Sequence, residues 1–138
     1  MHITVTGSHG FIGTHLVKHF LDNEHYLNCW DTEIGRNISD FTLKSVLEDT
    51  TDVIVHLAAL AGIRESIEDP DEYWKVNVEY TKRVFAVAEE TNTRVIYASS
   101  SACKRWHGNP YAISKYVNEF IAPKNSVGLR FSTVWGDG

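Results

Sequence analysis

The stretch Thr6-Gly7-Ser8-His9-Gly10-Phe11-Ile12-Gly13 decides the fold of this chain. It follows the β-rich run His2-Ile3-Thr4-Val5 and precedes a helical pattern in which Ile12, Leu16 and Phe20 share one face. In a strand-to-helix turn with the spacing G-x-x-G-x-x-G, the glycines permit the tight turn, the approach of a pyrophosphate and close helix packing. The stretch therefore predicts a phosphate-binding turn in which the N–H groups of the helix N-terminus face the phosphates.

Strand and helix patterns alternate along the rest of the chain. Further strands are expected at residues 26–30, 36–38, 53–57, 94–98 and 127–131. Long helices are expected at residues 72–90 and 111–121, and Ser39 or Asp40 would cap a short one. Alternation of this kind predicts crossover connections and a parallel sheet covered on both faces. We expect residues 1–138 to form one α/β domain with a Rossmann-type doubly wound sheet.

Composition narrows the class of protein. The 138 residues are 43% hydrophobic and 22% charged, as in a soluble globular domain, and the formal net charge of −5 argues against nucleic-acid binding. No apolar run reaches membrane-spanning length, and the early first strand leaves no room for a signal peptide, so a cytoplasmic location is expected. His15 and His19 are four residues apart but have no third partner, so no metal site is expected.

An acid stands at the end of the second expected strand. Asp31 is placed to accept hydrogen bonds from the hydroxyls of an adenosine ribose, and its charge would repel a 2′-phosphate. NAD is therefore favoured over NADP as the cofactor. Two alternatives stay open, because Asp31 could be a simple turn residue and the nearby Arg36 could accommodate a 2′-phosphate.

Three further motifs follow the glycine stretch. His56-Leu57-Ala58-Ala59 ends one buried strand, Ser99-Ser100-Ser101 ends the next, and Tyr111-Ala112-Ile113-Ser114-Lys115 opens a helix. In this order the motifs resemble those of the extended short-chain dehydrogenase/reductase family, which includes the NAD-dependent sugar-nucleotide epimerases and dehydratases. The resemblance runs the length of the chain, and it implies a cofactor domain of this kind.

The resemblance also implies roles for individual residues. Ser101, Tyr111 and Lys115 take the catalytic positions, and substrate contacts are expected from Arg64, Ser100 and Thr133. The implied cofactor-binding residues are Gly7, His9, Gly10, Phe11, Ile12, Gly13, Asp31, Asn37, Ile38, Leu57, Ala58, Ala59, Asn77, Ser99, Tyr111 and Lys115.

The catalytic trio also makes chemical sense on its own. Tyr111 and Lys115 are four residues apart and share one helix face, and an ammonium beside a phenol favours the phenolate. Such a phenolate can take a proton from a sugar hydroxyl while the nicotinamide accepts a hydride from the same carbon. Lys115 can also hold the nicotinamide ribose, and Ser101 can bind the reacting oxygen. A tyrosine and a lysine with this spacing also arise by chance in many helices, but the preceding strand and serine cluster favour the catalytic interpretation.

The chain departs from the family in three places. The segment between Asp31 and Asn37 is too short for the usual second helix, and Asn37 replaces the usual carboxylate beside the adenine. Only nine residues separate Ser101 from Tyr111. Trp106, in that connection, could either line the sugar pocket with its neighbour His107 or pack against the protein. The chain also ends at Gly138, where the family continues into a smaller C-terminal substrate domain.

The substrate is suggested only by the segment after the fourth expected strand, residues 53–57. Ala61-Gly62-Ile63-Arg64-Glu65-Ser66 resembles a segment of epimerases that act on UDP-sugars, including UDP-uronic acids. Arg64 could reach such a ligand, or it could pair with Glu65 or Glu68 on a solvated face.

Two classes of function follow. The leading hypothesis is an NAD-dependent enzyme that acts on a nucleotide sugar, with epimerase chemistry favoured over dehydratase chemistry because Cys103-Lys104 stands where an acidic pair is often found. The alternative is a non-catalytic NAD-binding module. A homodimer or higher homo-oligomer is expected, because the two long helices resemble the pair through which relatives associate.

Overall fold

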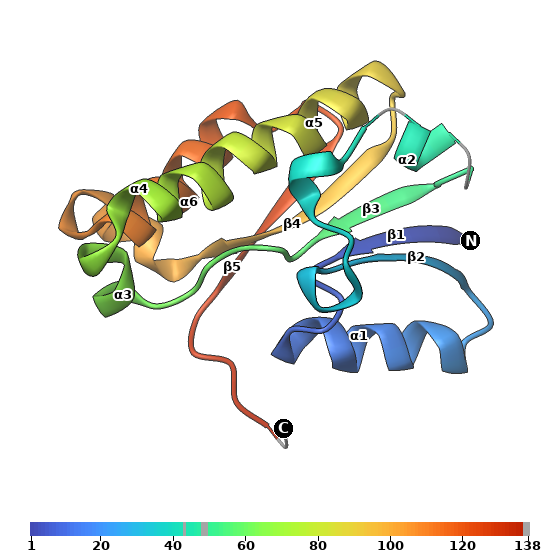
Figure 1. The fold of residues 1–138 in the computed structure, drawn as a ribbon, viewed down its shortest axis with the longest axis horizontal. Coiled ribbons are helices and arrows are strands. Elements are labelled where there is room, and N and C mark those ends of the chain that lie inside the picture. Colours follow the sequence, from blue (N-terminus) through green and yellow to red (C-terminus); the bar gives the residue numbers. More distant parts are fainter. Residues whose placement is uncertain (43, 48–49, 137–138) are drawn as a thin grey trace.

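The computed structural model describes residues 1–42, 44–47 and 50–136. Within these ranges, parallel strands form one sheet in the order β2-β1-β3-β4-β5 (Figure 1). The strands are β1 (His2–Thr6), β2 (Tyr26–Trp30), β3 (Val53–His56), β4 (Arg94–Ser100) and β5 (Ser126–Phe131). The chain moves from β1 outward to β2 and then back across β1 to the remaining strands, so the sheet is doubly wound. The predicted fold class is confirmed.

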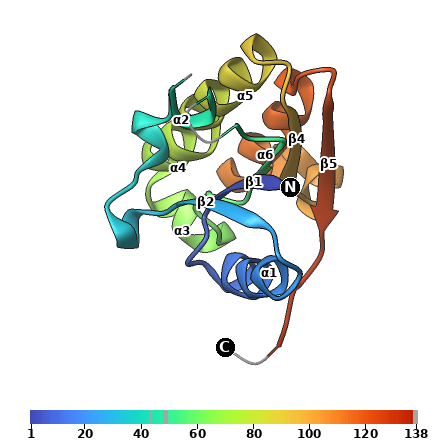
Figure 2. The ribbon, with the colours of Figure 1, turned by 90° about the vertical axis from the view of Figure 1, so that its right-hand side faces the viewer.

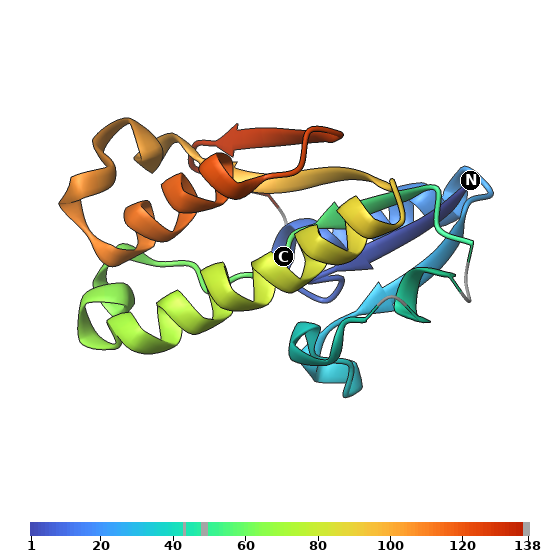
Figure 3. The same ribbon diagram turned by 90° about the horizontal axis from the view of Figure 1, so that it is seen from above.

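Helices cover both faces of the sheet. They are α1 (Phe11–Asp22), α2 (Lys44–Leu47), α3 (Ile63–Glu68), α4 (Pro70–Trp74), α5 (Thr81–Glu90) and α6 (Pro110–Ile121). Helix α1 packs on one face, and α5 and α6 pack on the other (Figure 2). Figure 3 shows α6 running beside the segment that contains α4 and α5. None of the described helices is both long and apolar enough to cross a membrane.

Each face has its own apolar core. Strand residues of β1 and β3, including Val5 and Val55, pack against Leu16 and Phe20 of α1. On the opposite face, the buried residues include Ile54, Val84, Phe85, Val95 and Tyr97. The central strands β1 and β3 are therefore buried on both faces, as their continuous apolar runs predicted, whereas β5 at the edge of the sheet is largely exposed.

The strand predicted at residues 36–38 is wrong. The side chain of Asn37 accepts a hydrogen bond from the Ser39 N–H at 2.9 Å and caps a 3₁₀ helix, η2 (Ile38–Asp40). An amide that accepts a hydrogen bond from a nearby backbone N–H competes with sheet pairing, which is why this segment turns instead of forming a strand. The capping role predicted for Ser39 or Asp40 thus falls to Asn37. A second 3₁₀ helix, η1 (Thr32–Ile34), precedes it, and β2 lies at the edge of the sheet.

The single helix predicted at residues 72–90 is divided into three parts. Helix α4 begins at Pro70, where the carboxylate of Asp69 accepts from the Glu72 N–H at 3.1 Å. A π-helical turn, η3 (Lys75–Tyr80), then separates α4 from α5. This turn buries Asn77 completely, and π-helical turns occur often at functional sites. Neither α3 nor the 3₁₀ segment η4 (Ser101–Gly108) was predicted from the sequence.

Candidate cofactor and active site

The glycine stretch forms a tight turn at the carboxyl end of β1. Gly7 has φ +71°, and a Cβ there would lie 2.6 Å from the backbone nitrogen of Ala58. A Cβ on Gly13 would lie 2.0 Å from the carbonyl oxygen of Gly7, so α1 packs directly on the turn. Gly10 precedes α1 without a side-chain cap, and the first N–H groups of a helix lack intrahelical partners. The turn therefore has the room and the free donors that a pyrophosphate needs.

Asp31 is held at the mouth of this turn. Its carboxylate accepts from the backbone N–H of His9 at 2.9 Å and from that of Glu33 at 3.1 Å. The second contact is the cap of η1, so Asp31 does serve as a turn residue. Each carboxylate oxygen can accept a further hydrogen bond, so the ribose role and the turn role are compatible.

Arg36 is engaged beside the acid. Its guanidinium donates to the side-chain oxygen of Asn28 at 2.7 Å and to the carbonyl of Cys29 at 3.0 Å. The same group lies 4.3 Å from the ring centre of Trp30, a cation–π distance. Both hydrogen bonds use Nη1, and they fix the guanidinium at the wall of the cavity that Asp31 also lines.

A cavity of about 500 Å³ lies at the carboxyl ends of the strands, where doubly wound sheets bind ligands. The predicted cofactor residues that line it are Gly7, His9, Gly10, Asp31, Asn37, Ile38, Leu57, Ala58 and Ala59. Lining residues that the sequence analysis missed include Trp30, Leu60, Val76 and Tyr80. Their apolar character was visible in the sequence, but their position in this cavity depends on the short β2–β3 connection and on the π-helical turn.

The predicted catalytic residues gather around a second cavity of about 550 Å³. Ser101 and Tyr111 line it, together with the predicted substrate residues Ser100 and Thr133. Lys115 is only 5% exposed, donates to the carbonyl of Ala98 at 3.0 Å, and lies 6.0 Å from the ring centre of Tyr111. Burial lowers the pKa of Lys115 to about 8. The structure therefore places a readily deprotonated cation behind the phenol.

Asn77 acts as a brace rather than as a wall of either cavity. Its side chain accepts from the Leu60 N–H at 2.8 Å and donates to the Leu60 carbonyl at 3.0 Å and to Ser114 Oγ at 3.2 Å. The amide of Asn118, a residue that the sequence analysis missed, donates to the Asn77 carbonyl at 2.7 Å. These bonds join the segment after β3 to the helix that carries Tyr111. The spacing of Ser114 and Asn118, four residues apart, was the available signal.

Ser99 points away from both cavities. It donates to a carboxylate oxygen of Glu119 at 2.5 Å, and Arg130 donates to the two oxygens of that carboxylate at 2.8 and 2.6 Å. Hydrogen bonds from Arg130 lower the pKa of Glu119. This cluster ties β4, β5 and α6 together, so Ser99 supports the site from behind and does not line the cavity predicted to hold the cofactor.

Three other side chains have defined surroundings. Arg64 Nε lies 3.4 Å from Glu68 on an exposed face and lines neither cavity. Trp106 stacks on Tyr116 with ring centres 5.3 Å apart, so it packs on the protein and is not among the residues that line the second cavity. His56 is buried between the hydroxyls of Thr6 and Thr81, and burial lowers its pKa to about 3, so it is a packed neutral histidine.

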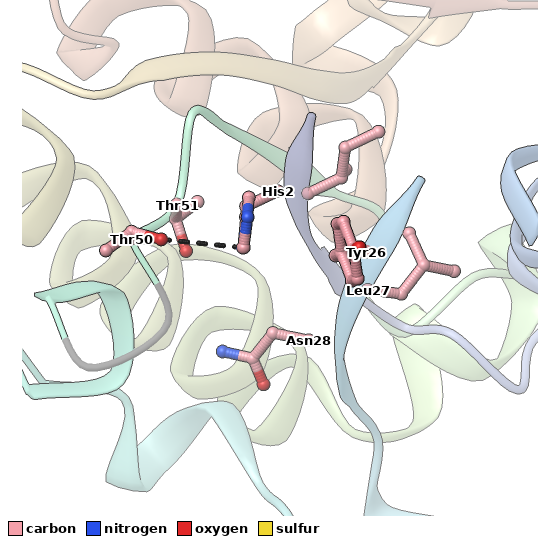
Figure 4. Close-up of a pocket in the computed structure, with 7 residues that line it drawn as sticks. His2, Tyr26, Leu27, Asn28, Thr50 and Thr51 are labelled. Carbon is pink, nitrogen blue, oxygen red and sulfur yellow. Dashed lines mark hydrogen bonds between the residues drawn. The ribbon is translucent and has the colours of Figure 1, made fainter. Parts of the chain in front are cut away.

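A third cavity, of about 340 Å³, lies at the other end of the sheet. It is bordered by His2, Tyr26, Leu27, Asn28, Thr50 and Thr51, with the His2 ring stacked on Tyr26 (Figure 4). These residues come from the amino ends of β1 and β2 and the segment before β3. No residue predicted to act in catalysis or cofactor binding lines this cavity.

The sheet order, the glycine turn and the acid after β2 define a dinucleotide-binding α/β protein. The sequence model of the NAD dependent epimerase/dehydratase family matches residues 3–134. The chain therefore belongs to the NAD-dependent epimerase/dehydratase family, and both the predicted family and the predicted cofactor are confirmed.

Individual relatives extend this finding. Protein CapI of Staphylococcus aureus is 29% identical over 99% of this chain and 55% of that protein, and a UDP-glucose 4-epimerase of Pisum sativum is 31% identical over 72% and 36%. The structure of MoeE5 in complex with UDP-glucose and NAD is similar with a TM-score of 0.86 at 26% identity, over 99% of this chain and 56% of that one. The chain thus spans about half the length of such relatives.

Proposed function

We propose that this chain is the cofactor-binding and catalytic part of an NAD-dependent enzyme that epimerises a nucleotide sugar by transient oxidation of one carbon. The observation that carries the proposal is that Ser101 and Tyr111 line the same cavity, with the buried Lys115 close to the phenol ring. A module that only bound NAD would have no need for this arrangement.

The chain's own residues suit the cofactor. Gly7, Gly10 and the first N–H groups of α1 would hold the pyrophosphate, and Asp31 would accept from the adenosine ribose. Asn37 and the buried Ile38 line the same cavity and would contact the adenine. When bound, NAD supplies a reversible hydride acceptor.

The catalytic residues have separate tasks. Tyr111 takes the proton of a sugar hydroxyl as the carbon that bears this hydroxyl is oxidised. It returns the proton when the same carbon is reduced by hydride transfer to the opposite face of the sugar. Lys115 stabilises the phenolate with its positive charge, and Ser101 donates a hydrogen bond to the reacting oxygen. Because Lys115 loses its proton at about pH 8, this stabilisation is expected to weaken above that pH.

Epimerisation is preferred to dehydration as the reaction. Dehydration needs an additional acid and base near the sugar, whereas the residues described as lining the second cavity include no acidic side chain. The names of similar proteins, among them UDP-glucose 4-epimerases, support a UDP-sugar as the substrate.

Cofactor binding and turnover are tested separately. We expect calorimetric titration to detect NAD binding, and we expect the NAD-saturated chain to interconvert UDP-sugars that differ in the configuration of one carbon. Tyr111→Phe should abolish turnover and leave NAD affinity within about twofold, because it removes the hydroxyl that transfers the proton and keeps the aromatic ring. NAD binding without turnover in the wild-type chain would favour the alternative, a non-catalytic NAD-binding module.

We also propose that the chain forms a homodimer through the outer face of α6. Ile113, Tyr116, Val117 and Phe120 follow one another at helical spacing on this face. The first three are partly buried, Trp106 stacks on Tyr116, and Phe120 is 81% exposed. Burial of such a stripe against a second copy would remove apolar surface from water. Light scattering should report twice the mass of one chain, and Phe120→Glu should halve that value.

A further inference from the structure

The short connection after the catalytic serine carries two cations into the second cavity. Segment η4 begins at Ser101, and Ser100 caps it by accepting from the Ala102 N–H at 3.2 Å. Its helical geometry breaks at Arg105, where φ is −129° and ψ is 49°. Both Lys104 and Arg105 line the cavity that Ser101 and Tyr111 also line.

These cations lack acidic partners. In the part of the chain that the structure describes, neither Lys104 nor Arg105 has a hydrogen bond or an ion pair, whereas Arg64, Lys75 and Arg130 each pair with a glutamate. The described lining of the cavity includes no aspartate or glutamate. A chain with a formal net charge of −5 therefore presents two positive charges without acidic partners at the exposed border of this cavity. Such a cavity attracts an anion.

We propose that Lys104 and Arg105 bind a carboxylate on the sugar itself, so that a nucleotide-linked uronic acid is the preferred substrate. This inference rests on the proposed function, which places the reacting sugar oxygen at Ser101 and Tyr111. Lys104 and Arg105 follow Ser101 within one short helical segment, so an anion that they hold lies beside the sugar ring. An arginine fork matches a carboxylate, and hydrogen bonds between charged groups are stronger than neutral ones.

The rest of the cavity also suits a sugar ring. Among its lining residues, Ser132 and Thr133 offer hydroxyl groups, and Ile63 and Phe131 offer apolar surface. The diphosphate of the nucleotide is a second anion that could meet Lys104 and Arg105. The two sources of negative charge differ in one respect, because only the sugar carboxylate is missing from UDP-glucose.

The test compares three ligands on the full NAD-saturated chain by NMR titration: UDP-glucuronate, UDP-glucose and UDP. We expect the wild-type chain to bind UDP-glucuronate at least about tenfold more tightly than UDP-glucose, as a charge-assisted hydrogen bond provides. The double variant Lys104→Met/Arg105→Gln should lose this preference and keep its affinity for UDP-glucose within about twofold. Arg64→Gln is the matched control, because Arg64 is an exposed cation that lines neither cavity.

The outcomes separate the hypotheses. Equal weakening of all three ligands in the double variant would assign the cations to the diphosphate and overturn the proposal. Equal affinity of the wild-type chain for UDP-glucuronate and UDP-glucose, or no binding of UDP-glucuronate, would overturn it as well. In each case normal NAD binding in the same samples would leave the proposed cofactor function standing, whereas failure of NAD to bind would refute that function. Both side chains are exposed, so the variants should fold, and circular dichroism checks this.

Discussion

The burial of His56 predicts a specific sensitivity of the fold to mild acid. Both ring nitrogens are engaged, one with Thr6 at 2.6 Å and the other with Thr81 at 2.9 Å, and the side chain is 4% exposed. Burial, and to a smaller extent the charge of Lys115, lowers the pKa of His56 from 6.5 to about 3. Between these two values the unfolded chain binds a proton that the native chain does not bind, so the free energy of unfolding falls as the pH falls.

The size of the effect follows from the two pKa values. At pH 5 the solution is 1.5 units below the unfolded pKa of 6.5 and still above the native one, so His56 alone removes about 2 kcal/mol from the stability present at neutral pH. Urea unfolding followed by tryptophan fluorescence at pH 7, 6 and 5 measures this loss. His56→Gln removes the titrating group, and its stability should fall by about 2 kcal/mol less than that of the wild type over the same range.

The test is the difference between the stability that the wild type loses from pH 7 to pH 5 and the stability that His56→Gln loses. Other titrating groups contribute to both, so their effect cancels in the difference. His56→Gln should be less stable than the wild type at pH 7, because it disturbs two buried hydrogen bonds. If wild type and variant lost equal stability between pH 7 and pH 5, the assignment of a neutral, buried His56 would be refuted.

Other changes have equally definite expected outcomes. Lys115→Met should raise the free energy of unfolding at pH 7 by about 2 kcal/mol, since it removes a buried charge and one hydrogen bond. Between pH 8 and 10.5, Lys115 is neutral in the native wild type but still charged in the unfolded chain, so the wild type becomes more stable and the gain should shrink. Urea titrations across this range measure the gain, and a constant gain would contradict the prediction. Gly13→Ala should cost about 2 kcal/mol or more and weaken NAD binding in calorimetry, whereas Gly108→Ala, whose new Cβ meets nothing within 4 Å, should change neither. Glu119→Gln should lower stability by about 1 kcal/mol in thermal melts, because Arg130 and Ser99 lose a charged partner; an unchanged melting temperature would contradict this role.

Sequence patterns were sufficient to predict the features that depend on residues close together in the chain. The buried strands, the glycine turn and the Tyr111–Lys115 pair are set by periodicity and by short spacings, and the structure has them where they were predicted. Asp31 was found because an acid after the second strand faces the glycine turn in this topology.

The remaining features depend on contacts between distant residues. Asn37 was predicted to lie in a strand because the hydrogen-bond pattern of its side chain with the Ser39 N–H cannot be recognised from the spacing of apolar residues. The π-helical turn is stabilised in part by Asn118, a residue 41 positions away from Asn77, so the helix pattern continued through it unbroken. No binding role was predicted for Lys104 or Arg105, because their place on the second cavity depends on how η4 folds after Ser101.

The central position of β1 has a consequence for how the chain acquires its site during synthesis. Although β1 and its glycine turn are made before β2 and β3, β1 pairs with both of these strands, and Gly7 packs against the backbone of Ala58. A nascent chain that ends before β3 has the turn without the surface against which it is shaped. Contacts so distant in sequence form slowly, because a long loop must close before they stabilise anything. The glycine turn therefore reaches its final shape only after β3 and Ala58, which follow it in the chain, have been made.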